Sequence, residues 1–511
     1  MQGLMAGASG AGVAADGLLR DARESWRRNQ PEGAFDLAWA AFDLAPDDYA
    51  TRAFIAKLLH QYPTLLPDER KTAYLRLLTD RTVEPNLINV AGWRLVLRRY
   101  RLAENAGDAA LEALIKGLEG DELPLMLLRE SPVSLLAAER LLSRLRRWLL
   151  VSGRWRDHPK IVDALKAQAG LNGGAWPFDE IERGLLAQEE GRPMSAAYLP
   201  VQEPKCLSTT ADRANPPADP VTRAVKSQYE GWPYPAWTRI TLDAPKRLPD
   251  VIAAMDPEVA KLLPVKANML IAGCGTGRQA ASVALRYPDA TVTAIDISKA
   301  SLDYARRQCA ALGIANLRFF KLDLHNVADL KQRFHAIHCA GVLHHLGSPE
   351  RGLELLADVL EPGGVMHIMV YNRHQRLMVM GARAFLIGDL LQEPVSDDLL
   401  RRVRQRFLQQ PEHPAASYVT RSRDFATLAG THDLLLHRHE DPFDFPRIER
   451  ALGQARMRML SFDMPSPVVE ARYDAMFPDD PKHCDIKSLA RFQDCDPALA
   501  LLHYSFWCCA R

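Results

Sequence analysis

The stretch Asn268-Met-Leu-Ile-Ala-Gly273-Cys-Gly275-Thr-Gly277-Arg-Gln decides the fold of the second half of this 511-residue chain. Met269 to Ala272 is an apolar run without polar alternation, as in a strand covered on both faces, and helical spacing follows from Arg278 to Tyr287. Between them, glycines at alternate positions allow a ligand to approach the backbone, while amides at the helix N-terminus point toward it. The stretch therefore predicts half of a strand–helix–strand unit with a ligand-binding turn.

A second predicted strand, Thr291 to Asp296, ends in a carboxylate about 20 residues after the glycines, where doubly wound folds bind a ribose diol. A dinucleotide fingerprint requires a further glycine at position 278, but this residue is Arg278. The G-x-G-x-G form therefore favours a ligand without phosphates, whose amino-acid tail lies over the turn.

From this point the chain resembles class I S-adenosylmethionine-dependent methyltransferases. Asp323, in Phe319-Phe-Lys-Leu-Asp323-Leu, stands where the third strand of that family ends and its acid bonds the adenine amino group. Gly341-Val-Leu-His344-His345-Leu346 resembles the fourth-strand motif, and Leu360 to Tyr371 resembles the turn and fifth strand. The resemblance implies a doubly wound α/β fold, a Rossmann-like sheet of seven strands in the order 3-2-1-4-5-7-6.

The resemblance also implies S-adenosyl-L-methionine as the cofactor. That family usually has Asp or Glu two residues before the first glycine, but this chain has Ile271, so other atoms must hold the ammonium group of the ligand. The residues expected at the cofactor are Ala272, Gly273, Cys274, Gly275, Gly277, Asp296, Ile297, Asp323, Leu324, Gly341 and Tyr229.

Composition excludes several classes of protein. The chain has 64 Lys+Arg and 63 Asp+Glu, so no global charge favours nucleic acid or an anionic membrane as partner. None of the eight cysteines forms a C-x-x-C pair, which argues against a disulfide framework and fits a reducing cytoplasm. No run approaches the ~18 apolar residues of a membrane helix. We therefore expect a soluble, cytoplasmic protein.

The first part of the chain is predicted to be all-α. Residues 1–16 are rich in Gly and Ala and are expected to be a flexible leader, and residues 17–200 show amphipathic helices separated by Gly and Pro. Asp36 to Pro46 resembles the second helix of a tetratricopeptide repeat. This resemblance predicts a short, degenerate array of tetratricopeptide-like helices that mediates partner binding or self-association. Arginines on one helical face, at 140, 144 and 147, allow an RNA groove but fit a solvated face better.

Residues 201–247 are rich in proline, and Gln228 to Trp237 contains four aromatic residues. Such a segment is not a plain spacer. Aromatic rings with polar tips suit a flap over the cofactor that includes Tyr229, and they suit a hydrophobic clasp between two domains equally well.

The catalytic domain is expected to occupy residues 248–511. Residues 373–454 separate the fifth strand from a sixth at Ala455 to Phe462, which is too long for an ordinary loop and is predicted to be a substrate lid. His503 to Ala510 alternates as a half-exposed strand does and is assigned as the antiparallel seventh strand.

Methyl transfer from a sulfonium is an in-line displacement that needs a well-positioned nucleophile. For a hydroxyl acceptor a base near neutral pKa helps, and His344 or His345, at the end of the fourth strand, is suitably placed. A place beneath the cofactor suits one of the pair equally well. Because consecutive residues of a strand end point opposite ways, His345 is favoured as the residue nearer the substrate. Tyr371, at the end of the fifth strand, is the third catalytic candidate.

A second polar cluster, His432, Asp433, His437, His439 and Glu440, lies in the expected lid. Its spacing fits no H-E-x-x-H motif, so an acceptor pocket with His432, Asp433 and His437 is preferred to a solvated surface, and both are preferred to a metal site.

The function predicted from the sequence is methyl transfer from S-adenosylmethionine to a small-molecule acceptor. RNA or protein methylation is the alternative within the enzyme class, and an inactive methyltransferase-like scaffold that acts through its helical domain is the alternative outside it. A nucleotide-dependent oxidoreductase is disfavoured by Arg278.

Overall fold

The computed structural model of the chain describes residues 10–101, 107–188, 193–199, 219–242, 244–496, 499 and 503–510. The chain divides into two compact units. The helical unit comprises residues 1–209, 239–241 and 382–436, and the sheet unit comprises residues 210–238, 242–381 and 437–511. Pro204, Pro216 and Pro217 of the expected linker lie outside the described residues. None of the described helices is long and apolar enough to span a bilayer.

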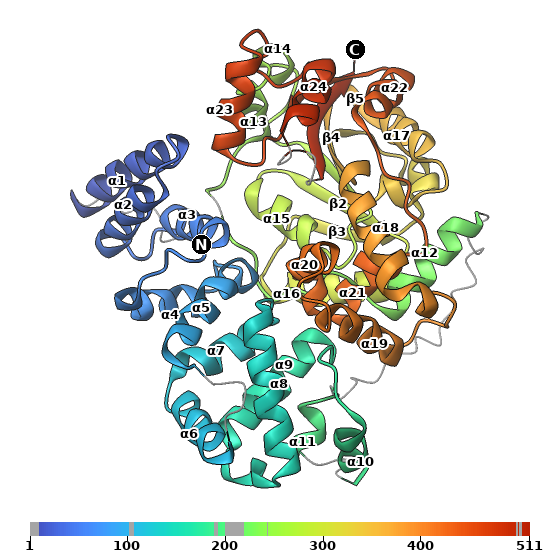
Figure 1. Cartoon of the computed structure of the whole chain (residues 1–511). Helices are drawn as coiled ribbons and strands as arrows, with labels where there is room; N and C mark the ends of the chain where they lie inside the picture. Colours follow the sequence, from blue (N-terminus) through green and yellow to red (C-terminus); the bar gives the residue numbers. More distant parts are fainter. Residues whose placement is uncertain are drawn as a thin grey trace. The chain divides into compact units, whose positions relative to one another are not determined.

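The first helix of the helical unit starts at residue 10, inside the expected leader of residues 1–16. Each helix packs on near neighbours in the sequence, for example α1 on α2 and α2 on α3 (Figure 1). Its helices and 3₁₀ turns (η) are α1 (Gly10–Arg27), α2 (Pro31–Leu44), α3 (Tyr49–Gln61), η1 (Asp68–Arg70), α4 (Lys71–Thr79), α5 (Pro85–Arg99), α6 (Asp108–Glu119), α7 (Glu122–Glu130), α8 (Leu136–Val151), η2 (Arg154–Asp157), α9 (Pro159–Asn172), α10 (Glu180–Gln188), α11 (Pro193–Ala196), η5 (Gly388–Leu390), α19 (Asp397–Leu408), α20 (Pro414–Thr420), η6 (Arg423–Ala426) and α21 (Leu428–Leu436).

Local sequence explains the helix boundaries near the N-terminus. Pro31 stands at the first position of α2, where a missing amide hydrogen costs nothing, and Ala34, Ala38 and Ala41 form its fully buried face. Asp48 caps α3 by accepting hydrogen bonds from the amides of the following turn. These residues specify short, tightly packed helices.

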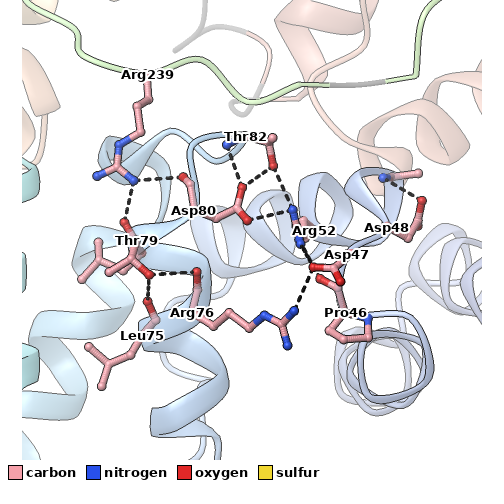
Figure 2. Close-up of polar contacts among 12 residues, drawn as sticks. Pro46, Asp47, Asp48, Arg52, Leu75, Arg76, Thr79, Asp80, Thr82 and Arg239 are labelled. Atoms are coloured by element: carbon pink, nitrogen blue, oxygen red, sulfur yellow. Dashed lines mark hydrogen bonds and ion pairs between the residues drawn. The ribbon is translucent and has the colours of Figure 1, made fainter. Parts of the chain in front are cut away.

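Arg52 joins the turns of this helical array (Figure 2). Its buried guanidinium forms ion pairs with Asp47 and Asp80, each at 2.7 Å, and its Nε donates to the Pro46 carbonyl. Arg239, from a segment distant in sequence, donates to the backbone carbonyls of residues 78 and 80, at 2.9 Å each. These arginine side chains therefore donate to backbone carbonyls that have no partner within the helices, which stabilises the array.

Residues 382–436 belong to the helical unit, whereas the sequence placed them within a lid of the catalytic domain. Arg404 of α19 is fully buried and donates to both carboxylate oxygens of Glu139, at 2.6 and 2.8 Å. Its Nε donates to the carbonyl of Ala175, and Arg401 donates to the carbonyl of Gly174. This part of the insertion thus completes the N-terminal helices.

The sheet unit contains a seven-stranded sheet in the order β3-β2-β1-β4-β5-β7-β6, which confirms the expected order. Strands β1 to β5 pair in parallel, and β7 runs antiparallel to β5 and β6. Its elements are α12 (Pro220–Gly231), α13 (Leu248–Ala253), α14 (Pro257–Ala260), β1 (Asn268–Ala272), α15 (Arg278–Arg286), β2 (Thr291–Asp296), α16 (Lys299–Ala311), β3 (Leu317–Lys321), η3 (Leu324–Leu330), β4 (Phe334–Ala340), η4 (Leu343–His345), α17 (Pro349–Asp358), β5 (Leu360–Val370), α22 (Phe445–Gln454), β6 (Met457–Phe462), α23 (Pro467–Met476), α24 (Ile486–Cys495) and β7 (Tyr504–Ala510); α18 (Arg373–Ile387) crosses into the helical unit.

Alternate residues of the strands enter two hydrophobic cores. In β1, Met269 and Ile271 face the core shared with α13 and α15, while Leu270 and Ala272 face the core shared with α17, α22 and α24. The strand is apolar throughout because both of its faces are covered. Ile271, which replaces the acid usual at this position, is a fully buried core residue. This packing places the carboxyl ends of β1 to β5 at one edge of the sheet.

Candidate active site

The turn between β1 and α15 requires its three glycines. Gly273, Gly275 and Gly277 have φ of +68°, +52° and +84°, a conformation that side chains disfavour. A Cβ on Gly273 would lie 2.4 Å from Cγ2 of Val342, and one on Gly277 would lie 2.6 Å from the Ala305 Cβ. The glycines therefore allow the turn to pack against α16 and the residues that follow β4.

Asp296, at the end of β2, holds this turn. Its carboxylate accepts the amide hydrogens of Gly275 at 2.7 Å and Ser298 at 2.8 Å. Burial raises the pKa of Asp296 to about 6, against the opposing effect of those hydrogen bonds. Backbone donors thus hold the carboxylate at the expected ribose position in place. Its protonation changes in the mildly acidic range, near pH 6.

The aromatic segment lies against the glycine turn within the sheet unit. The indole Nε1 of Trp237 donates to the carbonyl of Thr276 at 2.8 Å, and the Thr276 hydroxyl donates to the carbonyl of Pro235. The carbonyl of Tyr234 lies 3.2 Å from the position that a Cβ on Gly275 would take. Residues 234–237 therefore cover one side of the turn at the expected cofactor edge.

Glu230 fastens the same segment to α16. Its carboxylate accepts hydrogen bonds from the amides of Lys299 and Ala300, at 2.8 and 3.0 Å, so it occupies the N-terminus of that helix. The hydroxyl of Ser298 donates to the carbonyl of Tyr229. Sequence reasoning named Tyr229 but missed Glu230, because only the fold brings this residue to the amide of Lys299, 69 positions later in the sequence.

Asp323, at the expected adenine position, is paired with His325. Its Oδ1 lies 2.8 Å from the His325 Nδ1 and accepts the His325 amide hydrogen. Burial raises the pKa of the Asp323 carboxyl, but the hydrogen bonds with His325 outweigh this effect and lower it below its usual value. The hydrogen bond to Asp323 raises the pKa of His325. Asp323 is therefore ionised, and His325 orients it.

Three aromatic rings predicted to be catalytic meet where β4 and β5 end. The His344 ring stacks on Tyr371 at a centroid distance of 3.8 Å and lies 4.2 Å from the ring of His345. His345 in turn stacks on His437 at 3.7 Å. The His437 Nδ1 accepts the amide hydrogen of His439, so its Nε2 carries the proton and donates to the Tyr229 hydroxyl at 3.3 Å. Residues from four separate segments thus form one cluster, which we call the imidazole cluster.

Both histidines of the sequence pair are neutral. Burial lowers the pKa of His345 to about 3, although its hydrogen bond with the His439 carbonyl opposes this. Burial lowers the pKa of His344 well below its ordinary value, and its neighbouring imidazoles act in the same direction. The cluster therefore offers uncharged imidazoles at physiological pH.

A buried ion pair fixes the segment that carries His437. Arg376, on α18, donates through Nη2 to both carboxylate oxygens of Glu440, at 2.6 and 2.5 Å, and through Nε at 3.1 Å. The side chains are only 3% and 9% exposed. The Arg376 guanidinium also lies 5.0 Å from the centroid of the Tyr371 ring. Sequence reasoning missed Arg376, because only the fold brings it to Glu440.

The predicted acceptor cluster is divided between the units. His432 and Asp433 are buried in α21 of the helical unit, whereas His437, His439 and Glu440 belong to the sheet unit. Among the described residues, no group of three His, Cys, Asp or Glu side chains is arranged to hold a metal ion. A shared role for His432, Asp433 and His437 stays a prediction.

Comparison with known proteins agrees with this geometry. Residues 269–364 match the family model of methyltransferase domains. A protein of uncharacterised function from Synechococcus sp. is 39% identical over 182 residues, which cover 34% of this chain and 43% of that protein. A trans-aconitate 2-methyltransferase from Deinococcus radiodurans is 33% identical over 27% of this chain and 52% of its own length. A tRNA 5-carboxymethoxyuridine methyltransferase from Escherichia coli is 33% identical over 24% and 48%.

The chain spans about half the length of these curated relatives. The family match does not include the N-terminal helices, so the tetratricopeptide resemblance stays a prediction. The sheet order is that of the methyltransferase Rossmann-like fold, and the glycine turn lies within the range that matches the family model of methyltransferase domains.

Proposed function

We propose that the protein transfers a methyl group from S-adenosyl-L-methionine to a small-molecule acceptor. The observation that carries this proposal is the edge formed by the glycine turn, Asp296 and Asp323. Two carboxylates stand at the ends of β2 and β3, beside a turn whose glycines admit a ligand against the backbone. Their positions suit hydrogen bonds to a ribose diol and an adenine amino group.

The imidazole cluster supplies the acceptor side of the proposal. His344 and His345 follow β4, and ligands of doubly wound sheets bind beyond the carboxyl ends of the strands. The cofactor, when bound, supplies an electrophilic methyl group on a sulfonium. His345 then orients the acceptor, Tyr371 supports the His344 ring, and residues near His437 recognise the rest of the molecule.

Two measurements with the full chain test this function. Calorimetry with S-adenosylhomocysteine should show one site per chain, because a single glycine turn carries the contacts. Incubation with methyl-labelled S-adenosylmethionine and fractionated cell extract should then place the label in a small-molecule fraction. Absence of binding would contradict the cofactor assignment, and binding without any label transfer would favour the scaffold alternative.

RNA methylation is the second candidate, because one relative is named as a tRNA methyltransferase. Another relative is named for a small acid, so the names alone do not select the acceptor. The near balance of 64 basic and 63 acidic residues favours the small molecule. If the label is recovered in the RNA fraction and becomes acid-soluble only after ribonuclease treatment, RNA is the acceptor and the small-molecule proposal is wrong.

A further inference from the structure

The backbone sets the two adjacent histidines of the imidazole cluster in opposite tautomers. The amide of Tyr371 donates to the His344 Nδ1 at 3.2 Å, and because an amide is always a donor, this nitrogen carries no proton. The His345 Nδ1 lies 2.9 Å from the carbonyl oxygen of His439, which can only accept. Nδ1 of His345 therefore carries its proton.

These tautomers leave one nitrogen of each ring available. The His344 Nε2 carries a proton, is buried, and has no hydrogen-bond partner among the described residues. The His345 Nε2 carries a lone pair, and none of the hydrogen bonds among the described residues uses it. A buried donor without an acceptor is destabilising, because its hydration is lost and nothing replaces it. A bound group that accepts from His344 would remove this cost.

We propose that the methylated group of the acceptor is a hydroxyl, which donates to the Nε2 of His345 and accepts from the Nε2 of His344. This inference rests on the proposed function and specifies its substrate class. The ring centroids are 4.2 Å apart, and two hydrogen bonds of about 2.8–3.0 Å to one oxygen span up to about 6 Å. The spacing of the rings is compatible with a single oxygen atom that bonds both nitrogens.

Other acceptor groups match the pair less well. A carboxylate has no proton for His345, and an ammonium has no lone pair for His344. The ionic groups of the cluster, Arg376 and Glu440, are paired with each other, so they present no net charge to an ionised acceptor. A neutral hydroxyl satisfies both nitrogens without an uncompensated charge.

The transfer step follows from these contacts. A second lone pair of the hydroxyl oxygen attacks the sulfonium methyl carbon and forms the new C–O bond. The C–S bond breaks, and its electron pair stays on sulfur, which becomes a neutral thioether. Attack converts the hydroxyl into a protonated ether, which is acidic enough to give its proton to the Nε2 of His345 although burial lowers the pKa of this imidazole to about 3, below the near-neutral value that the sequence predicted. The Nδ1 proton of the resulting imidazolium stays bonded to the His439 carbonyl, and the transferred proton then leaves to solvent.

Chemical identification of the methylated group tests the inference. Label transferred to extract fractions should survive mild alkali and be released by ether-cleaving acid, as a methyl ether is. Label released as methanol by mild alkali, or retained as an N-methyl group, would overturn the hydroxyl assignment and leave the methyltransferase function standing. If S-adenosylhomocysteine binds but no fraction is labelled, the proposed function fails and the hydroxyl assignment fails with it.

Two variants then test the roles of the nitrogens, with the labelled fraction as substrate. His345→Asn keeps a donor for the His439 carbonyl but removes the Nε2 lone pair, so turnover should fall by about a hundredfold or more. His344→Asn keeps an acceptor for the Tyr371 amide but removes the donor, so turnover should fall by about tenfold. Affinity for S-adenosylhomocysteine should stay within about twofold in both variants. His374→Asn, an exposed histidine on α18, is the matched control.

Nitrogen-15 spectra of the imidazoles check the tautomers independently of activity. The full chain should show a protonated Nε2 for His344 and a protonated Nδ1 for His345. His344→Gln, whose longer amide reaches toward the Nε2 position, should recover part of the turnover lost in His344→Asn. The opposite tautomers, or equal activity of the two His344 variants, would overturn the proposed pairing.

Discussion

The cofactor edge and the imidazole cluster of the sheet unit are built in different ways. At the cofactor edge, the amide of Gly275 and the carboxylate of Asp296 are 21 positions apart in the sequence, and the contacts are made largely by the backbone. In the imidazole cluster, His345 bonds a carbonyl 94 positions away, and Tyr229 bonds a histidine 208 positions away. The first region depends on local sequence, whereas the second depends on the complete fold.

This difference predicts different responses to substitution. A change at the cofactor edge should act mainly on ligand affinity, because the contacts there are few and direct. A change in the imidazole cluster should propagate, because each ring is held by another ring or by a distant carbonyl. The comparison fails if substitutions in the two regions have the same consequences.

The largest effect is expected for Glu440→Gln. Removing one partner of a buried ion pair leaves the charge of Arg376 uncompensated, which costs about 3–5 kcal/mol of unfolding free energy. Chemical denaturation measures this loss. The exposed pair of Arg351 and Glu354 supplies the control, since Glu354→Gln should cost about 0.5 kcal/mol or less. Equal losses in the two variants would show that Glu440 does not hold the cluster.

Gly273→Ala should have the next largest effect. The new Cβ would lie 2.4 Å from Val342, in a residue whose φ is +68°, so we expect about 2–4 kcal/mol of lost stability together with loss of cofactor binding. Thermal melts and calorimetry measure both quantities. Gly381, inside α18 and without atoms near its Cβ position, is the matched control, and alanine there should stabilise the helix by up to about 1 kcal/mol. Intact binding in Gly273→Ala would contradict the assignment of the turn.

Asp296→Asn should weaken S-adenosylhomocysteine binding by about 1–3 kcal/mol, because the carboxylate that accepts the ribose hydroxyls is lost. Calorimetry gives this difference directly. Asp289→Asn, at an exposed carboxylate, should leave the affinity unchanged. Unchanged affinity in both variants would show that Asp296 does not bind the ribose.

The smallest expected effect is a pH dependence with opposite signs for binding and stability. Because the pKa of Asp296 is raised to about 6, the folded protein binds this proton more tightly than the unfolded chain, so the stability contributed by this group is lost as the pH rises through 6. Ribose hydroxyls favour the ionised form, so S-adenosylhomocysteine affinity should fall as the pH drops below 6, by at most about tenfold per pH unit. Thermal melts from pH 5 to 7, with and without ligand, test both signs. Affinity that increases toward acid would exclude Asp296 as the titrating group.

Much of the sheet unit was predictable from the sequence, because each strand carries its own signal. The apolar run Met269 to Ala272 and the acid that ends the strand at Asp296 are local patterns, and the observed sheet order confirms the expected one. The grouping of residues 382–436 with the helical unit was not predictable. Arg404 binds a carboxylate and a carbonyl more than two hundred positions earlier, and no periodicity in α19 indicates those partners.

The candidate site shows the same limit. His344, His345 and Tyr371 were selected from their positions at strand ends, and the structure brings them together. Their roles in catalysis stay predictions. Their tautomers depend on the Tyr371 amide and the His439 carbonyl, which are backbone groups without a sequence signature. The burial of the Arg376–Glu440 pair likewise follows only from the packing of α18 against residues far along the chain.

The helical unit combines N-terminal helices with residues 382–436, and this has a consequence for the order in which its parts are synthesised. On the ribosome, the N-terminal helices emerge long before α19, so the carboxylate of Glu139 has no Arg404 to pair with until translation has passed the first five strands of the sheet. A carboxylate that is buried in the finished protein must stay hydrated or bound by a chaperone during that interval. The helical unit is therefore completed after most of the sheet has been made, although its N-terminal helices leave the ribosome before the sheet does.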